Sequence, residues 1–347
     1  MDQDRHVERP VPRAREQAVT HVRRAGAVAV LAALVLACAS KNAGQPRDPT
    51  GVAPPVTATT GTIVELEPGP RVVFALSDVH GGYDRLAALL AAVGLARPAP
   101  PSAGAITWAG GDAVLVVAGD LIDKGPQPIE VIDALRALEV SAEASGGRVV
   151  VLLGNHEAEF FVNPTNAKAD GSDGVDRELA ALQIDPGVLA AGTEPRGAWL
   201  LARPFGARVG RWFFSHGGST RGRTVAALDA ALRAALAAHP TFDADEIVGG
   251  DSILEARDWY ADPAVTVANA AALGVDHIVF GHDPNALGAR GAIAVAQDTR
   301  LLRIDCGMSP TVNDSEGRVL RIRHEGAVEI AEELGVASSR ELFRASR

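Results

Sequence analysis

The chain has 347 residues, of which 47% are hydrophobic and 22% are charged, and its formal net charge is −10. This composition is typical of a soluble folded protein with a buried core. A protein with this net negative charge does not attract long nucleic acid electrostatically, so we expect no nucleic-acid partner.

Residues 1–38 have the parts of an export signal. Arg23 and Arg24 precede a short run of small and apolar residues at 25–37, and the sequence V-L-A-C ends at Cys38. The run is too short to span a bilayer and suits a signal peptide. Since V-L-A-C resembles the lipobox of bacterial lipoproteins, we expect lipidation of Cys38 and a protein held on the periplasmic side of a bacterial cell envelope. That N-terminal lipid is the expected membrane contact; an uncleaved anchor and an ordinary cleaved signal are the alternatives.

The remaining chain divides by composition. Residues 39–69 are rich in Pro, Thr and Gly, which predicts a flexible linker. Residues 70–335 have the pattern of one α/β domain, in which the less regular stretch 158–207 predicts a helical cap or insert. Residues 336–347 are expected to form a C-terminal tail.

Short apolar runs rich in Val predict buried strands. They lie at 72–76, 114–118, 149–153, 212–214 and 277–280. Apolar residues at helical spacing at 86–93 and 132–140 predict helices between the first strands. Alternation of strand and helix favours a parallel-rich sheet covered by helices.

Polar motifs with flanking glycines follow each predicted strand. They are SDVHGG from Ser77, GDLIDKG from Gly119, GNHE from Gly154, SHGG from Ser215 and GHD from Gly281. Ligands of open α/β sheets bind outside the carboxyl ends of the strands. We therefore expect one edge to gather Asp78, His80, Asp120, Asn155, His216 and His282.

These residue types point to a metal centre. Carboxylate oxygens and neutral imidazoles suit two divalent ions such as Mn, Fe or Zn. A pair of ions about 3.5–4 Å apart can activate a shared hydroxide and clamp a phosphoryl group. Such a pair needs a bridging carboxylate, for which Asp120 is the natural candidate.

The ordered motifs resemble those of the calcineurin-like metallophosphoesterase superfamily and, within it, the phosphoprotein phosphatase branch, marked by GDxHG, GDxxDRG, GNHE and HGG. Three further pieces, GAWL from Gly197, the Trp259–Tyr260 pair and RIDCGMS from Arg303, resemble bacterial Shewanella-like protein phosphatases. The resemblance covers residues 72–322. It implies a β-sheet core, arranged as a two-sheet sandwich flanked by helices, with the metal site at the strand C-terminal ends. It also makes 70–335 the metallophosphoesterase catalytic domain.

The resemblance also implies a role for each matching residue. Asp78 and His80 would hold the first metal, with Asp120 bridging. The second metal would be held by Asn155, His216 and His282. His156 would be the general acid that protonates the leaving alkoxide, and Asp123 would orient it.

Two departures from the family pattern stand out. Ser77 replaces the usual Gly of the first motif, and Lys124 replaces the phosphate-binding Arg of GDxxDRG. Lysine keeps the charge but loses the bidentate fork, so this change bears on phosphate affinity and substrate class. Arg257 is the candidate second phosphate ligand, with an ordinary surface arginine as the alternative.

The expected function is hydrolysis of phosphomonoesters, with phosphoprotein side chains as substrate, by attack of a metal-bridging hydroxide. Hydrolysis of small phosphoanhydrides or dinucleoside polyphosphates is the alternative enzyme activity, because both substrates meet the same metals. A catalytically inactive tethered binding protein is a third hypothesis, and the replacement at Lys124 is its support. The partner is thus a phosphorylated protein or small molecule.

Overall fold

The computed structural model describes residues 61–67, 71–97, 102–288, 290–312 and 315–346. The predicted signal peptide at 1–38, Cys38 included, and most of the predicted linker lie outside these residues. Among the helices of the described segments, none has the length and apolarity needed to cross a membrane.

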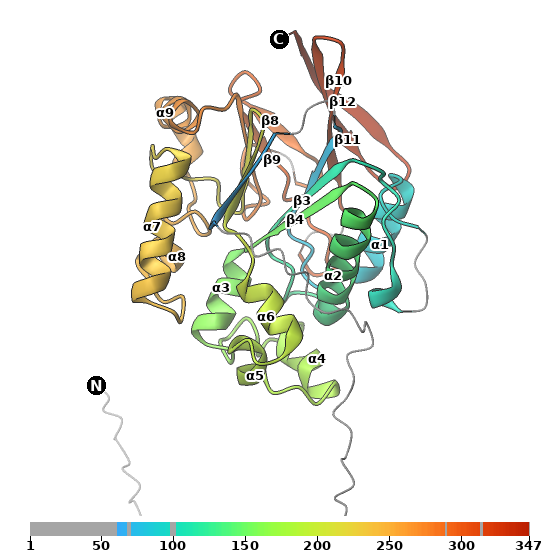
Figure 1. Ribbon diagram of the computed structural model, residues 1–347, viewed down its shortest axis with the longest axis vertical. Coiled ribbons are helices and arrows are strands. Elements are labelled where there is room, and N and C mark those ends of the chain that lie inside the picture. Colours follow the sequence, from blue (N-terminus) through green and yellow to red (C-terminus); the bar gives the residue numbers. More distant parts are fainter. Residues whose placement is uncertain (1–60, 68–70, 98–101, 289, 313–314, 347) are drawn as a thin grey trace, which may run out of the picture. The chain divides into compact units, whose positions relative to one another are not determined.

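Two mixed β-sheets form the centre of the fold (Figure 1). Sheet A orders its strands β1 (Ile63–Leu66), β5 (Gly206–Val209), β6 (Trp212–Ser215), β7 (His277–Phe280), β9 (Leu301–Arg303) and β8 (Ala294–Ala296). Sheet B orders its strands β12 (Ser339–Ser346), β11 (Val328–Leu334), β10 (Val319–Glu325), β2 (Val73–Leu76), β3 (Val114–Ala118) and β4 (Arg148–Leu152). Strands β2, β3 and β4 pair in parallel, as do β6, β7 and β9. The expected α/β sandwich is confirmed.

Alternation along the strands builds two apolar layers. In β3, Val114 and Val116 pack into the core between the sheets, whereas Leu115 and Val117 belong to the core beneath the helices. All four are buried. This explains why the predicted strands are apolar at every position, since each face of the sheet is covered.

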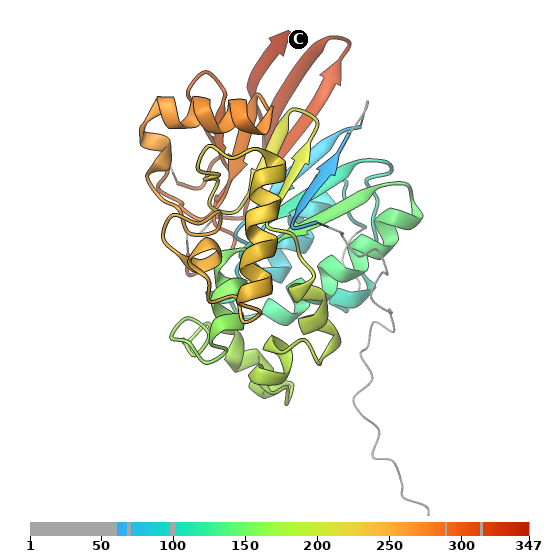
Figure 2. The same ribbon diagram turned by 60° about the vertical axis from the view of Figure 1, so that its left-hand side comes forward.

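Helices cover the outer faces and one end of the sandwich. Their bounds are α1 (Tyr83–Ala92), α2 (Pro128–Ala144), α3 (Asn155–Val162), α4 (Val175–Ala181), α5 (Pro186–Ala190), α6 (Pro195–Leu201), α7 (Val225–Ala238), α8 (Asp245–Val248) and α9 (Pro263–Leu273), with 3₁₀ turns η1 (Ala103–Ala105) and η2 (Trp259–Ala261). Helices α3 to α6 gather at one end, and strands β10 to β12 extend from the opposite end (Figures 1 and 2). The stretch 158–207, where a cap or insert was predicted, contains α4, α5 and α6.

Two predicted boundaries need correction. Residues 63–66, placed in the flexible linker, form β1, which pairs in parallel with β5. Residues 339–346, placed in the tail, form β12 at the edge of sheet B, paired with β11. Strand β1 is four residues long beside a Pro/Thr-rich stretch, and β12 has largely exposed side chains. Strand β1 is held by backbone pairing with a strand distant in sequence, and β12 by a hairpin with the preceding strand β11. Neither strand has a strong apolar pattern.

Candidate metal centre

The polar residues predicted from the strand-end motifs meet at one end of the sandwich. Sheet B supplies those after β2, β3 and β4, and sheet A supplies those after β6 and β7. In chain order they are Asp78, His80, Asp120, Asn155, His216 and His282. Each is at most 6% exposed. The cluster is therefore buried and shared between the two sheets.

The loops that carry these side chains adopt an unusual backbone. Asp78, His80, Asp120 and His282 have φ between 46° and 66°, in the left-handed region. This conformation costs a residue with a Cβ about 1–2 kcal/mol. Backbone hydrogen bonds between the loops after β2 and β3 stabilise this conformation. They run from Asp78 N to Gly119 O at 3.1 Å and from His80 N to Asp120 O at 2.9 Å. The loops thus fix each other.

Glycine is required where helix α3 approaches the loop after β3. A Cβ on Gly154 would lie 2.2 Å from both the backbone nitrogen and Oδ1 of Asp120. No side chain fits at that separation. The glycine of the GNHE motif therefore lets Asn155 and Asp120 share one site.

Asp120 lies between two groups of donor atoms. Its Oδ2 is 3.4 Å from Nε2 of His80, which is in turn 3.8 Å from Oδ1 of Asp78. Its Oδ1 is 3.2 Å from Nε2 of His216, and that nitrogen is 3.0 Å from Oδ1 of Asn155. Among the described residues, two sets of donor atoms could hold a cation, Asp120 with His80 and His156 and Asp120 with Asp78 and His216. This carboxylate faces both positions.

Backbone carbonyls determine which ring nitrogen of each histidine faces the cluster. The pairs are His80 Nδ1 with Ile122 O at 3.0 Å, His216 Nδ1 with Ala118 O at 2.9 Å, and His282 Nε2 with Glu255 O at 3.1 Å. A carbonyl accepts hydrogen bonds and cannot donate, so the nitrogen beside it carries a proton. The opposite nitrogen of each ring then points at the cluster.

The contact between His282 and Asn155 tests whether these donors fit a cation. Burial and the nearby charge of His216 lower the pKa of His282 to about 2, so its ring is neutral. Its unprotonated Nδ1 lies 3.2 Å from Oδ1 of Asn155, whose amide Nδ2 donates to Glu159 at 3.3 Å. Two lone pairs therefore face each other. Neighbouring donors bound at about 2.1 Å to one divalent ion lie about 3 Å apart, so this geometry fits a metal ligand set.

Electrostatics links His216 to the carboxylates. Burial alone would lower the pKa of His216, but the charge of Asp120, a hydrogen bond to it and the charge of Asp78 raise that pKa to about 10. Burial also opposes ionisation of Asp120, yet the charges of His216 and His156 hold its pKa well below the usual range. A histidine must lose the proton on its binding nitrogen before it can hold a metal, so metal binding here releases a proton.

A buried histidine–carboxylate pair adjoins the cluster. Nδ1 of His156 lies 2.8 Å from Oδ2 of Asp123, and Nε2 of His156 is 3.8 Å from Oδ2 of Asp120. The second oxygen of Asp123 accepts a bond from the backbone N–H of Val175 at 3.0 Å. Both oxygens of Asp123 are thus engaged, which fixes the ring of His156 with Nε2 toward the cluster.

The two predicted phosphate ligands lie on different sides of the centre. Lys124 is exposed, and its Nζ is 3.1 Å from Nε2 of His80. The side chain of Arg257 is half exposed, with Nη1 3.6 Å from Oδ1 of Asp283 and Nη2 3.5 Å from the carbonyl oxygen of His282. Each donor group of the cluster therefore has a cation beside it.

Glu157, the last residue of the GNHE motif, organises the loops behind the cluster, a role not predicted from sequence. Its Oε1 accepts from the backbone N–H groups of Leu121 and Ile122 at 2.8 and 3.1 Å. Its Oε2 accepts from those of Gly154 and Asp120 at 2.8 and 3.1 Å. A Glu three residues after a helix N-cap commonly bonds back to the cap N–H, and that spacing is the clue in the sequence.

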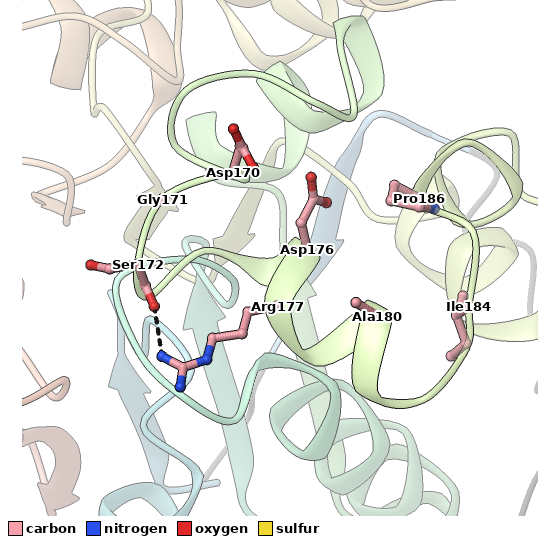
Figure 3. Close-up of a pocket in the computed structure, with 8 residues that line it drawn as sticks. All are labelled: Asp170, Gly171, Ser172, Asp176, Arg177, Ala180, Ile184 and Pro186. Carbon is pink, nitrogen blue, oxygen red and sulfur yellow. Dashed lines mark hydrogen bonds between the residues drawn. The ribbon is translucent and has the colours of Figure 1, made fainter.

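The helical end of the fold has a surface pocket of about 520 Å³. It is lined by Asp170, Gly171, Ser172, Asp176, Arg177, Ala180, Ile184 and Pro186 (Figure 3). Arg177 turns back to the carbonyl oxygen of Ser172, at 3.1 Å. None of the predicted site residues lines this pocket, so it is separate from the metal centre. The same segment nevertheless contacts the centre through Val175.

Carboxylate, imidazole and amide donors at two adjacent positions, with a buried His–Asp pair beside them, define a metal-dependent hydrolytic centre on an α/β sandwich. A model of the calcineurin-like phosphoesterase family matches residues 72–286, and the chain belongs to that family. It is therefore a hydrolase that acts on phosphoester bonds.

Two relatives are similar in sequence. An uncharacterised protein of Schizosaccharomyces pombe is 41% identical over 101 residues, which are 29% of this chain and 27% of that protein. This chain thus spans about a quarter of that relative. Shewanella-like protein phosphatase 2 of Arabidopsis thaliana is 23% identical over 313 residues, covering 75% of this chain and 77% of the relative.

Two solved structures share the fold. A cold-active protein-tyrosine phosphatase of a psychrophilic Shewanella species matches with a TM-score of 0.63 and 22% identity, over 81% of this chain and 82% of that chain. A protein serine/threonine phosphatase of Saccharomyces cerevisiae matches with a TM-score of 0.54 and 15% identity, over 80% and 85%.

Proposed function

We propose that this protein is a dinuclear-metal phosphatase that hydrolyses phosphomonoesters, with phosphoprotein side chains as its substrate class. The observation that carries the proposal is the position of Asp120, whose two carboxylate oxygens face two separate groups of donor atoms. The protein phosphatase names of the Arabidopsis relative and the Shewanella structure support the choice of substrate.

The ligand roles follow from the two donor groups. One ion would be bound by Asp78, His80 and Asp120. The second ion would be bound by Asn155, His216 and His282, with Asp120 as the bridging ligand. The donor types suit Mn, Fe or Zn. When bound, two such ions supply an activated water as nucleophile and neutralise charge on the phosphoryl oxygens.

His156 is proposed as the general acid. Its Nδ1 proton is held by Asp123, so a second proton on Nε2 is available to the leaving alkoxide. Transfer of that proton leaves neutral imidazole with Nδ1–H still bonded to Asp123, and the product alcohol departs uncharged. Asp123 acts through His156 and is a positioning residue.

Lys124 and Arg257 are proposed to hold the phosphoryl oxygens that face away from the metal ligands. Both carry charged groups at the exposed side of the centre. A lysine ammonium acts as a point charge and not as a bidentate fork. Phosphate capture here would depend more on charge than on the orientation of the donor.

The test is hydrolysis of an aryl phosphate by purified protein with added Mn²⁺. Wild type should turn the substrate over, Asp120→Asn should abolish turnover, and the exposed Asp112→Asn should behave as wild type. Activity that survives complete chelation or the Asp120 change would overturn the proposal. Phosphoserine and phosphotyrosine peptides should then be better substrates than a dinucleoside tetraphosphate; the reverse ranking would favour phosphoanhydride hydrolysis instead.

We also propose that the protein is anchored in a bacterial cell envelope through lipidated Cys38, on the basis of the lipobox-like sequence. Wild type expressed in a bacterial host should sediment with membranes, and Cys38→Ser should move it to the soluble periplasmic fraction. Cys306→Ser, at the buried cysteine of the domain, is the matched control and should stay with membranes. Membrane association that is unchanged in Cys38→Ser would contradict the anchor.

A further inference from the structure

Lys124 contacts the atom of His80 that would bind a metal. Nδ1 of His80 carries a proton because it lies 3.0 Å from the carbonyl oxygen of Ile122, which leaves the lone pair on Nε2. Nζ of Lys124 lies 3.1 Å from that Nε2. The ammonium therefore donates to the lone pair that a cation would require.

The backbone of Lys124 is fixed from several sides. Asp123 and Lys124 are consecutive residues in the left-handed region, with φ of 60° and 56°. The carbonyl oxygen of Lys124 accepts hydrogen bonds from the hydroxyls of Ser309 and Thr311. Gly125 N donates to the carbonyl oxygen of Asp173 at 3.0 Å. The backbone from which this ammonium reaches His80 is thus fixed by the loop.

The cations on the other side of the centre behave differently. Nζ of Lys168 lies 2.6 Å from Oε1 of Glu159, and the guanidinium of Arg257 lies 3.6 Å from Asp283. Each of these cations faces a carboxylate outside the ligand set. Arg257 also reaches His282, but at its backbone carbonyl oxygen. The ammonium of Lys124, by contrast, points at the ring nitrogen of His80 that would bind a metal.

The two donor groups are also unequal in size. In the ligand sets proposed above, Asp78, His80 and Asp120 are three protein donors at one position, whereas Asn155, His216, His282 and Asp120 are four at the other. Fewer donors and a neighbouring positive charge both weaken the binding of a divalent cation. Charge and ligand number therefore both weaken metal binding at the position of Asp78 and His80.

We propose that Lys124 is a built-in competitor for the metal position at Asp78 and His80, so that the two metal positions fill in sequence. The position at Asn155, His216 and His282 fills first. The position at Asp78 and His80 fills when the ammonium leaves Nε2 of His80 and turns toward the phosphate. This inference rests on the dinuclear centre of the proposed function and adds a regulation of its metal content.

The experiment is a calorimetric titration of the metal-free full chain with Mn²⁺, which measures binding without turnover. Wild type should show two sites whose Kd values differ by about tenfold or more. Lys124→Met, of similar length and uncharged, should tighten the weaker site by about tenfold or more and leave the stronger site unchanged. Lys124→Gln provides a second uncharged variant, and a thermal melt of each variant verifies folding.

Two further sets of variants assign the sites and control for charge. Asp78→Asn should remove the weaker site, and His282→Gln should remove the stronger one. Lys168→Met removes the other ammonium beside the centre and should leave the weaker site as in wild type. A weaker site unaffected by both uncharged variants at Lys124, or tightened equally by Lys168→Met, overturns the inference alone. Wild type that binds no Mn²⁺ overturns the proposed function as well.

Discussion

Nδ1 of His156 lies 2.8 Å from Oδ2 of Asp123, and both side chains are buried beside the donor cluster. A carboxylate in this position selects the tautomer of the ring and stabilises its charged form. The pair can therefore present a proton from Nε2 toward a leaving group, and the identity of that leaving group should decide how much the pair matters.

Asp123→Asn should lower kcat by about 100-fold on a phosphoserine peptide, whose alkoxide leaves poorly without a proton, and by less than about tenfold on p-nitrophenyl phosphate. Asparagine tolerates the left-handed backbone at this position. The measurement is kcat on both substrates, with metal content determined in parallel. Equal losses on the two substrates, with metal content intact, would contradict a role in protonating the leaving group.

Glu157→Gln should destabilise the fold and weaken metal binding. The two carboxylate oxygens accept from four backbone N–H groups, and an amide NH₂ in place of either oxygen would leave donors facing a donor. Such unsatisfied buried groups cost about 1–3 kcal/mol. Urea unfolding measures the change in free energy. Glu143→Gln, at an exposed site on α2, is the control and should match wild type; a Glu157→Gln curve that overlays it would refute this role.

Divalent metal should stabilise the folded protein. Since a ligand bound by the folded state alone adds about 2.7 kcal/mol at 100 times its Kd, Mn²⁺ at that excess should raise Tm by about 5 °C. Excess EDTA should reverse the shift, and Asp120→Asn should show little of it. A Tm that does not respond to Mn²⁺ would mean that the donors do not form a metal site.

Glu178→Gln should stabilise the protein at alkaline pH. Burial, followed by a hydrogen bond and charge repulsion from Glu130, raises the pKa of Glu178 from 4.5 to about 9, and its Oε2 accepts from Ile129 N at 2.6 Å. The folded state therefore holds this proton at pH values where the unfolded chain has lost it, so stability falls as pH rises from about 4.5 to about 9.

Glutamine keeps the hydrogen bonds of protonated Glu178 without titrating. The Tm of Glu178→Gln should exceed that of wild type by about 2 °C or more at pH 8 and should match it at pH 4.5. A difference of equal size at both pH values would show that packing, and not ionisation, is responsible.

The positions of the buried strands and of the clustered side chains could be predicted from sequence because the information is local. Val114 and Val116 lie in an unbroken apolar run, and Asp120 follows it after a glycine. The carboxyl ends of neighbouring parallel strands meet at one edge, so the motif residues had to converge.

Other features depend on partners distant in the chain. Strand β1 is specified by its pairing with β5, and the contact from Lys124 to His80 depends on a loop fixed by Ser309. Glu157 is part of the GNHE motif, but its four backbone partners come from loops that meet only after folding. Local sequence patterns do not predict such contacts.

The division of the cluster between the sheets also governs when the protein can acquire its metals. Asp78, His80, Asp120 and Asn155 are synthesised early, whereas His216 and His282 come late and lie in the other sheet. A partly made or unfolded chain cannot present the complete set. For the exported protein proposed above, a chain that crosses the membrane unfolded would take its ions from the compartment where it folds. The metal available there, and not in the cytoplasm, would determine which enzyme is made.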